Sequence, residues 1–120
     1  MKVGKWVFAV VAIGAWASAS ADCTYPKAPD SIPDGATASQ DEMVSAMTAF
    51  KQYNTDVTAY LACLETETAD KVREAGGATA TIVQVKSMQG KKHNAAFGEL
   101  QKLAEKFNEQ VRTFKARAKA

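Results

Sequence analysis

Apolar residues recur every three or four positions through two long stretches of this chain, which is the spacing of one face of an α-helix. The first stretch has its apolar line at Met43, Met47, Phe50, Val57, Leu61 and Leu64. The second is strongest in its later half, at Phe97, Leu100, Leu103, Ala104, Phe107, Val111 and Phe114. Steps of three and four form the heptad spacing of a coiled coil, so we expect two long helices. Asn54 interrupts the first line, and a buried asparagine there would fix register or oligomeric state.

Residues at the ends of both stretches mark the helix boundaries. Ser39 followed by Glu42 matches a capping box, in which the serine side chain accepts a hydrogen bond from a backbone N–H of the first turn. The pair Gly76-Gly77 ends the first stretch, as glycine commonly does after a helix. We therefore predict helices over about 39–75 and 79–117.

The predicted fold class is all-α, an antiparallel two-helix hairpin within residues 37–120, because a short glycine turn folds two helices back on each other. With that turn at its tip, residues whose numbers add to about 153 face each other. Asp41 then lies near Arg112, and Glu67 lies near Lys86. Each such exposed ion pair contributes only ~0–1 kcal/mol, but the charge signs favour this arrangement over a parallel one.

The segment 22–36 is expected to lie along the helices as an extended strap. It reads DCTYPKAPDSIPDGA and contains all three prolines of the chain. Proline fixes φ and biases the preceding residue toward extended backbone, and residues 33–35 are typical of a turn. We expect Tyr25 and Ile32 to pack on the helices. Gly90 is expected to leave room for the strap on the facing helix. We expect that helix to be one long helix with a soft spot at Gly90, and the sequence leaves open whether it kinks there.

Residues 1–21 have the organisation of a cleavable secretory signal peptide. Lys2 and Lys5 precede an uncharged apolar run, and Ala19-Ser20-Ala21 fits the small-residue cleavage rule before Asp22. A membrane-spanning helix needs roughly 20 apolar residues, and this run is shorter. We therefore predict export to the periplasm or beyond, with no stable membrane anchor after cleavage.

Cleavage changes the charge balance. The chain has 15 Lys and Arg against 13 Asp and Glu. Removing Lys2 and Lys5 leaves 13 of each sign, a formal net charge of zero. A neutral chain with interspersed charges lacks the basic footprint of a nucleic-acid-binding protein, so we expect no nucleic-acid partner.

Cys23 and Cys63 are the two cysteines. In an exported protein an isolated pair most often forms a disulfide; the alternatives are two free thiols or a metal site, with His93 as the only histidine. The bond would close a loop of about 40 residues and stabilise the fold by roughly 4 kcal/mol. The extended strap spans at most about 50 Å and must cover roughly 39 Å of helix, so it reaches Cys63 when nearly taut.

No set of residues resembles an active site or a cofactor site. His93 is the one group suited to proton transfer near neutral pH, but no second histidine or cysteine stands at ligand spacing, so we assign it to packing or hydrogen bonding. Met43, Met47 and Met88 offer the soft ligands that haem iron accepts, yet they lie on the apolar lines and are expected in the core. We predict no enzyme activity and no cofactor.

Four short motifs resemble a group of small secreted proteins from proteobacteria. The motifs are Cys23-Thr24-Tyr25-Pro26, Ile32-Pro33-Asp34-Gly35, Glu42-Met43 and Tyr60-Leu61-Ala62-Cys63-Leu64-Glu65. The group shares a Cys-x-x-Pro start, an I-P-D-G turn, a capped helix and a Y-L-x-C-L-E segment. The resemblance covers roughly residues 22–65. It implies an extracytoplasmic location and a disulfide, and it implies no mechanism.

The sequence therefore predicts a non-enzymatic periplasmic interaction or structural protein. Its partner would be an unidentified protein or a second copy of the chain, since a hairpin has a thin core and a four-helix bundle would thicken it. The alternative is a protein that binds a small ligand or lipid in the groove between strap and helices. An exposed apolar patch favours a protein partner, and an enclosed apolar pocket favours a ligand.

Overall fold

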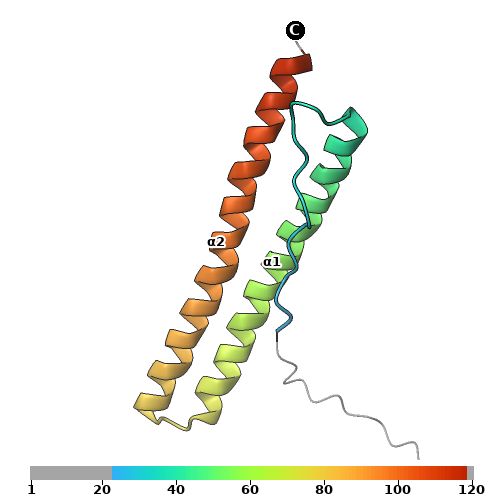
Figure 1. Cartoon of the computed structure of the whole chain (residues 1–120). Coiled ribbons are helices and arrows are strands. Elements are labelled where there is room, and N and C mark those ends of the chain that lie inside the picture. Colours follow the sequence, from blue (N-terminus) through green and yellow to red (C-terminus); the bar gives the residue numbers. More distant parts are fainter. Residues whose placement is uncertain (1–22, 119–120) are drawn as a thin grey trace, which may run out of the picture.

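The computed structural model describes residues 23–118, and within them the chain is an antiparallel hairpin of two helices with no strand (Figure 1). Helix α1 spans Gln40–Glu74 and helix α2 spans Thr79–Ala118. The predicted bounds differ from these by at most one residue at each end. The predicted signal peptide and its cleavage site lie outside the described residues.

The predicted helix boundaries have the expected local chemistry. The Ser39 side chain accepts a hydrogen bond from the backbone N–H of Glu42 at 3.1 Å, which caps α1. In the hairpin turn, Gly76 has a φ of 57° and Gly77 a φ of 89°. Residues with a Cβ atom avoid this left-handed region, so the two glycines permit the reversal.

The second helix is continuous, as predicted, because α2 runs without interruption through all 40 of its residues, Gly90 included. Gly90, Lys91, His93 and Asn94 are exposed. The polar run therefore marks a solvent-facing side of the helix, and the backbone hydrogen bonds continue through it.

The buried line of α1 begins as predicted and then follows a different phase. It contains Met43, Ala46, Phe50, Tyr53, Val57, Tyr60 and Leu64, at alternating steps of three and four. Tyr53 is 2 % exposed, whereas Asn54 is exposed and Met47 is 39 % exposed. The predicted line through Met47 and Asn54 was wrong because a tyrosine ring buries far more apolar area than an asparagine.

Helix α2 supplies a matching line from its inward side. Ala96 is fully buried against Tyr60 and Leu64, where its small side chain permits close approach. Farther from the turn, the rings of Phe50 and Phe107 stack with centroids 5.6 Å apart. A single seam of this kind forms the interior between the helices.

The facing residues are offset from the predicted register. The pairs Phe50–Phe107 and Glu67–Lys92 have numbers that add to 157 and 159, where the turn position predicted about 153. The predicted ion pairs of Asp41 with Arg112 and of Glu67 with Lys86 do not form among the described residues. Side chains tilt toward the N-terminus of their helix. On α1 this tilt points away from the turn, and on α2 it points toward the turn. Two side chains that meet therefore belong to residues whose numbers add to more than the predicted 153.

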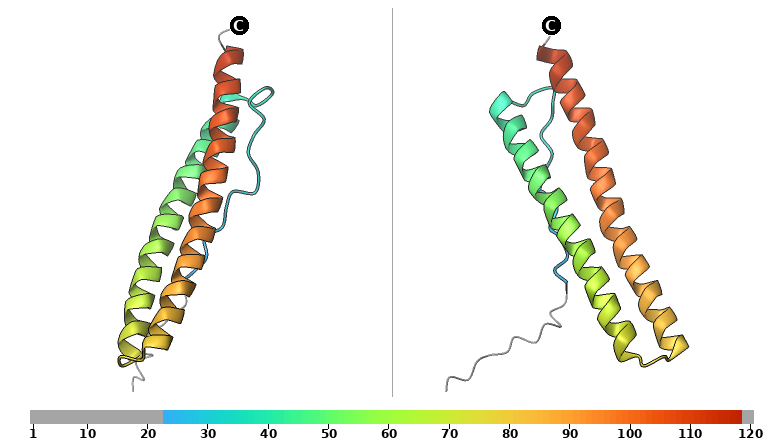
Figure 2. Two further views of the ribbon diagram at one scale, coloured as in Figure 1. Left: turned by 90° about the vertical axis from the view of Figure 1, so that its left-hand side faces the viewer. Right: turned by 180° about the vertical axis from the view of Figure 1, so that it is seen from behind.

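The strap lies against one face of the hairpin and runs from the middle of α1 toward the open end (Figures 1 and 2). Its backbone comes closest to α2 at Gly35, whose N–H donates to Oε1 of Gln110 at 2.8 Å. Beyond it, the Asp34 carbonyl accepts from the N–H groups of Thr37 and Ala38, so the turn begins at Asp34, slightly later than predicted. Arg117 donates to the carbonyls of Ala36, at 2.7 Å, and of Ala38, which ties the end of α2 to this turn.

Gly35 is required by a close contact with α2. A Cβ atom at this position would lie 2.1 Å from the backbone oxygen of Gln110. At Gly90, where the sequence led us to expect the strap, a Cβ atom would meet nothing within 4 Å. That expectation was wrong because the described strap crosses α2 nearer its C-terminal end.

The two glycines provide a matched pair of substitutions. Gly35→Ala should lower the free energy of unfolding by about 1–3 kcal/mol, because the added methyl group forces backbone apart. Gly90→Ala should raise it by about 0.5–1 kcal/mol, as expected for an exposed helix interior. Urea unfolding followed by circular dichroism measures both. Equal effects of the two substitutions would contradict the strap position.

Candidate functional site

The first described residue of the strap is covalently joined to α1. Cys23 and Cys63 form the predicted disulfide, with their Cα atoms 5.8 Å apart. The bond closes a loop across 40 positions and holds the strap to the middle of α1. A structural disulfide of this kind persists in an oxidising compartment.

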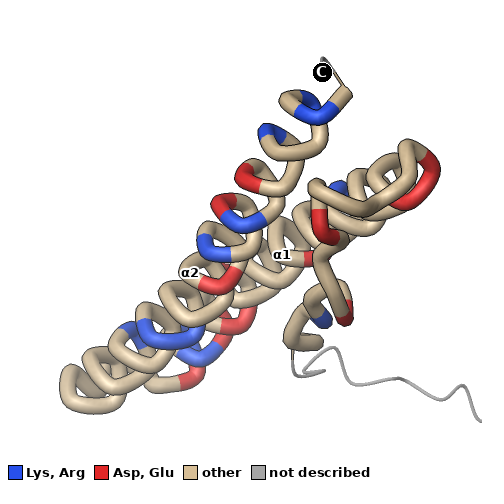
Figure 3. The backbone as a smooth tube through the Cα atoms, turned by 45° about the horizontal axis from the view of Figure 1, so that its top comes forward, with Lys and Arg blue, Asp and Glu red and all other residues tan. Residues whose placement is uncertain are grey.

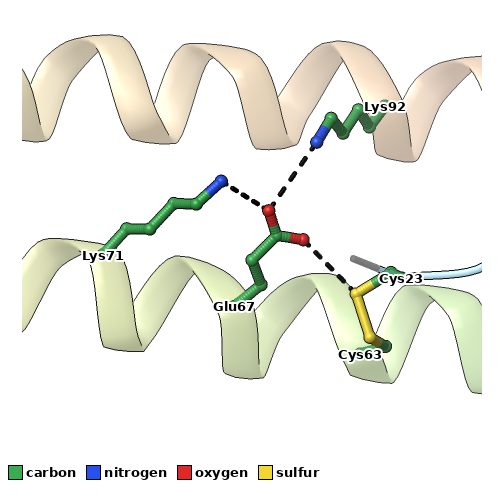
Figure 4. Close-up of polar contacts among 5 residues, drawn as sticks. All are labelled: Cys23, Cys63, Glu67, Lys71 and Lys92. Atoms are coloured by element: carbon green, nitrogen blue, oxygen red, sulfur yellow. Dashed lines mark hydrogen bonds and ion pairs between the residues drawn. A yellow bond between two sulfur atoms is a disulfide. The ribbon is translucent and has the colours of Figure 1, made fainter. Parts of the chain in front are cut away.

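Glu67 joins the disulfide to both helices (Figure 4). One carboxylate oxygen, Oε2, contacts Sγ of Cys23 at 3.3 Å; the bonded sulfur has no hydrogen to donate. The other, Oε1, accepts a hydrogen bond from Lys71 and lies 3.8 Å from Nζ of Lys92 on α2. The hydrogen bond from Lys71 lowers the pKa of Glu67, and it outweighs the opposing effect of partial burial.

Tyr25 attaches the strap to both helices, as predicted. Its ring meets the ring of Tyr60 edge to face, with centroids 5.3 Å apart. Its hydroxyl donates to Oε2 of Glu99 on α2 at 2.9 Å. Partial burial and the bond to Glu99 raise the pKa of Tyr25 to about 12. Tyr53 is buried in the seam nearby, and burial likewise raises its pKa.

The middle of the strap fills one part of the groove that the sequence offered as a ligand site. Ile32 and Pro33 lie against Phe50 of α1 and Phe107 of α2, and the space left among them is about 10 Å³. Such a volume holds at most a single water molecule. A ligand at this point would have to displace the strap. Nearer the disulfide, an open hollow of about 450 Å³ lies between the strap and α1, beside Tyr25 and Tyr60.

The individual residues considered as ligands are separated from one another. His93 is exposed and stacks on Phe97 with ring centroids 6.0 Å apart. Met43 is buried as predicted, but Met47 and Met88 are exposed, so their predicted place in the core was wrong. Within residues 23–118, no cluster of three His, Cys, Asp or Glu side chains could hold a metal ion.

The face opposite the strap is not covered by any described segment (Figure 2). Two residues in a helix are separated by about 200°, so Leu61 points away from Cys63, and Phe97 points away from Glu99. Residues seven positions apart share a face. The uncovered face is therefore made of Met47, Asn54, Leu61, His93, Phe97, Gln101, Ala104, Asn108 and Val111.

This uncovered face is apolar for a surface. Phe97 is 42 % exposed and Met47 is 39 % exposed, while Leu61 and Val111 are half-buried. Elsewhere basic and acidic residues alternate along α2 (Figure 3). Phe97 and Leu61 belong to the apolar lines that predicted the seam, yet they lie on this face. The sequence does contain a signal for the uncovered face, because α2 has more apolar residues than one seam can bury.

No known protein-family model, curated protein or solved structure matches this chain. Neither described helix is long and apolar enough to cross a membrane.

Cys63→Ser should release the end of the strap while leaving most of the helix seam in place. We expect the free energy of unfolding to fall by about 2–5 kcal/mol, as for removal of a native disulfide. Cleavage by trypsin after Lys27 should be slow in the oxidised protein and fast in the variant or after reduction, because proteolysis needs the strap to detach. Equal cleavage in both redox states would contradict a packed strap.

Glu67 should make stability depend on acidity. A carboxyl group with a lowered pKa in the fold stabilises above its unfolded pKa, and this contribution disappears as the pH falls through the folded value. The wild type should therefore lose more stability than Glu67→Gln when the pH falls from neutral to well below the usual value of 4.5. Urea unfolding at both pH values measures the difference. Glu65→Gln is the control, and an acid response equal to that of Glu67→Gln would contradict the assignment.

Proposed function

We propose that this chain is a non-enzymatic periplasmic interaction or structural protein that binds a protein partner through the uncovered face. The observation that carries the proposal is the exposure of Phe97 and Met47 on one side of a hairpin whose other side is covered by its own strap. A patch of apolar side chains on an otherwise polar surface is typical of a protein contact.

The disulfide and the predicted signal peptide both support this location. The disulfide indicates an oxidising compartment. The predicted signal peptide supplies the export route, and the periplasm is the compartment we propose. The neutral predicted mature chain and the mixed charges of α2 offer no field that would select a nucleic acid.

The groove between strap and helices leads us to prefer a protein partner over a small ligand. Ile32 and Pro33 already occupy the apolar middle of the groove, where only about 10 Å³ remains. The hollow of about 450 Å³ beside Tyr25 is open to solvent, whereas ligand pockets are clefts that enclose most of the ligand. The exposed apolar area lies on the opposite face, where a flat helical surface suits another protein.

A photo-crosslinking amino acid at residue 97 tests this proposal in the periplasm. We expect it to form a covalent adduct of defined mass, because Phe97 is at the centre of the uncovered face. The same amino acid in place of Glu105, which is exposed on the outer side of α2, is the matched control.

The outcome contrary to the proposal is an absence of adducts at residue 97, or adducts of equal yield at residues 97 and 105. The mass of the adduct also separates a second copy of this chain from a different protein.

A further inference from the structure

We infer that the uncovered face binds a second copy of this chain, with the two hairpins back to back and antiparallel in a four-helix bundle. This inference rests on the proposed function and names its partner. The two-fold axis would lie in the plane of contact between the two uncovered faces. It would be perpendicular to the helices, at the level of Asn54 of α1. The straps would then lie on the two outer faces of the bundle.

The positions on α1 are complementary to themselves under this symmetry. A two-fold axis at Asn54 places Met47 of one copy against Leu61 of the other, because each is seven residues from the axis. Both side chains are apolar, and both are incompletely buried in the single hairpin. Isologous interfaces require this relation, in which residue i meets j and j meets i.

The positions on α2 follow the same symmetry. An axis at the level of Ala104 places Phe97 of one copy against Val111 of the other, because each is seven residues from Ala104. Both side chains are apolar, and a larger side chain facing a smaller one interdigitates well. Phe97 is 42 % exposed in the single hairpin, so its ring is available to the other copy.

One axis serves both helices. The numbers of Asn54 and Ala104 add to 158. The side-chain contacts between α1 and α2 give 157 for Phe50–Phe107 and 159 for Glu67–Lys92. The two centres therefore lie at one height along the hairpin. If the centres were at different heights, the two helices could not be paired simultaneously.

Asn54 gives a reason to choose this orientation. On the axis its amide meets the same amide of the other copy, and each can both donate and accept a hydrogen bond. A single asparagine in an apolar helix line commonly fixes register and oligomeric state. In the parallel arrangement, α1 of one copy faces α2 of the other, and Asn54 meets apolar side chains near Ala104. A buried amide without a partner is unfavourable.

The area available is sufficient for a stable dimer. A helix of 35 residues is about 52 Å long, and two helices side by side are roughly 20 Å wide. An axis at Asn54 overlaps residues 40–68 of the two copies, about 42 Å of helix, so the face offers roughly 800 Å² per copy. This equals the ~800 Å² per partner of a standard interface. Its central residues, from Met47 to Leu61 and from Phe97 to Val111, carry no charge on this face, so no charged group is desolvated there.

Sedimentation of the exported, oxidised protein at micromolar concentration measures the association. The wild type should be a dimer, and Phe97→Lys should raise the dissociation constant at least about tenfold, since it puts a charge inside the contact. Ser87→Lys adds the same charge at an exposed position outside this face and should leave the constant unchanged. A monomeric wild type, or equal weakening by both variants, would overturn the inference.

A cysteine crosslink tests the orientation independently of any effect on folding. With the native disulfide intact, a short bismaleimide should join two copies of Asn54→Cys, because the two sulfurs meet on the axis. Thr55→Cys is the control, since residue 55 is exposed and points outward. Failure of Asn54→Cys to crosslink, or equal crosslinking at Thr55→Cys, would refute the antiparallel dimer. A photo-adduct at residue 97 with a different protein would then leave the proposed function standing without the dimer.

Discussion

The Cys23–Cys63 bond is the constraint on which the strap, and so the difference between the two faces, depends. Ordering the backbone of one residue costs roughly 1–2 kcal/mol, and the strap buries few large side chains to offset that cost. The disulfide and the three prolines reduce the freedom of the unfolded strap before it docks. Tyr25 and Gly35 then determine where it lies. Without the covalent bond, these contacts would compete with the full entropy of a free chain end.

Glu67 and Glu99 show how polar contacts join the strap to the seam without burying an isolated charge. Each carboxylate is on the strap side of its helix and bonds to residues of another element. Glu67 lies between two lysines and the disulfide, and the favourable bond to Lys71 is reflected in its lowered pKa. Exposed ion pairs contribute little individually. Their value here is positional, because they relate α1, α2 and the strap at one level of the hairpin.

The sequence alone was sufficient to predict the elements and their order, because caps, glycines and the heptad pattern are local signals. Ser39, Gly76 and Gly77 behave as predicted, and the cysteine pair is bonded. The phase of the α1 seam was not predictable in the same way. Tyr53 and Asn54 are neighbours that each continue a heptad line, and only the packing partners on α2 decide between them. The strap also required tertiary information, since the contact of Gly35 with Gln110 spans 75 positions.

The uncovered face is the part of the molecule that sequence patterns describe least well. A heptad line predicts that a helix has an apolar side, but a broad apolar surface can serve a seam inside the chain and a contact outside it. Leu61 and Cys63, and likewise Phe97 and Glu99, divide these roles between residues two positions apart. Asn54 likewise lies on the uncovered face, next to Tyr53 of the seam. Its place on an otherwise apolar line is anomalous for an internal seam, yet it is consistent with a contact between copies, where an amide can meet its own symmetry mate.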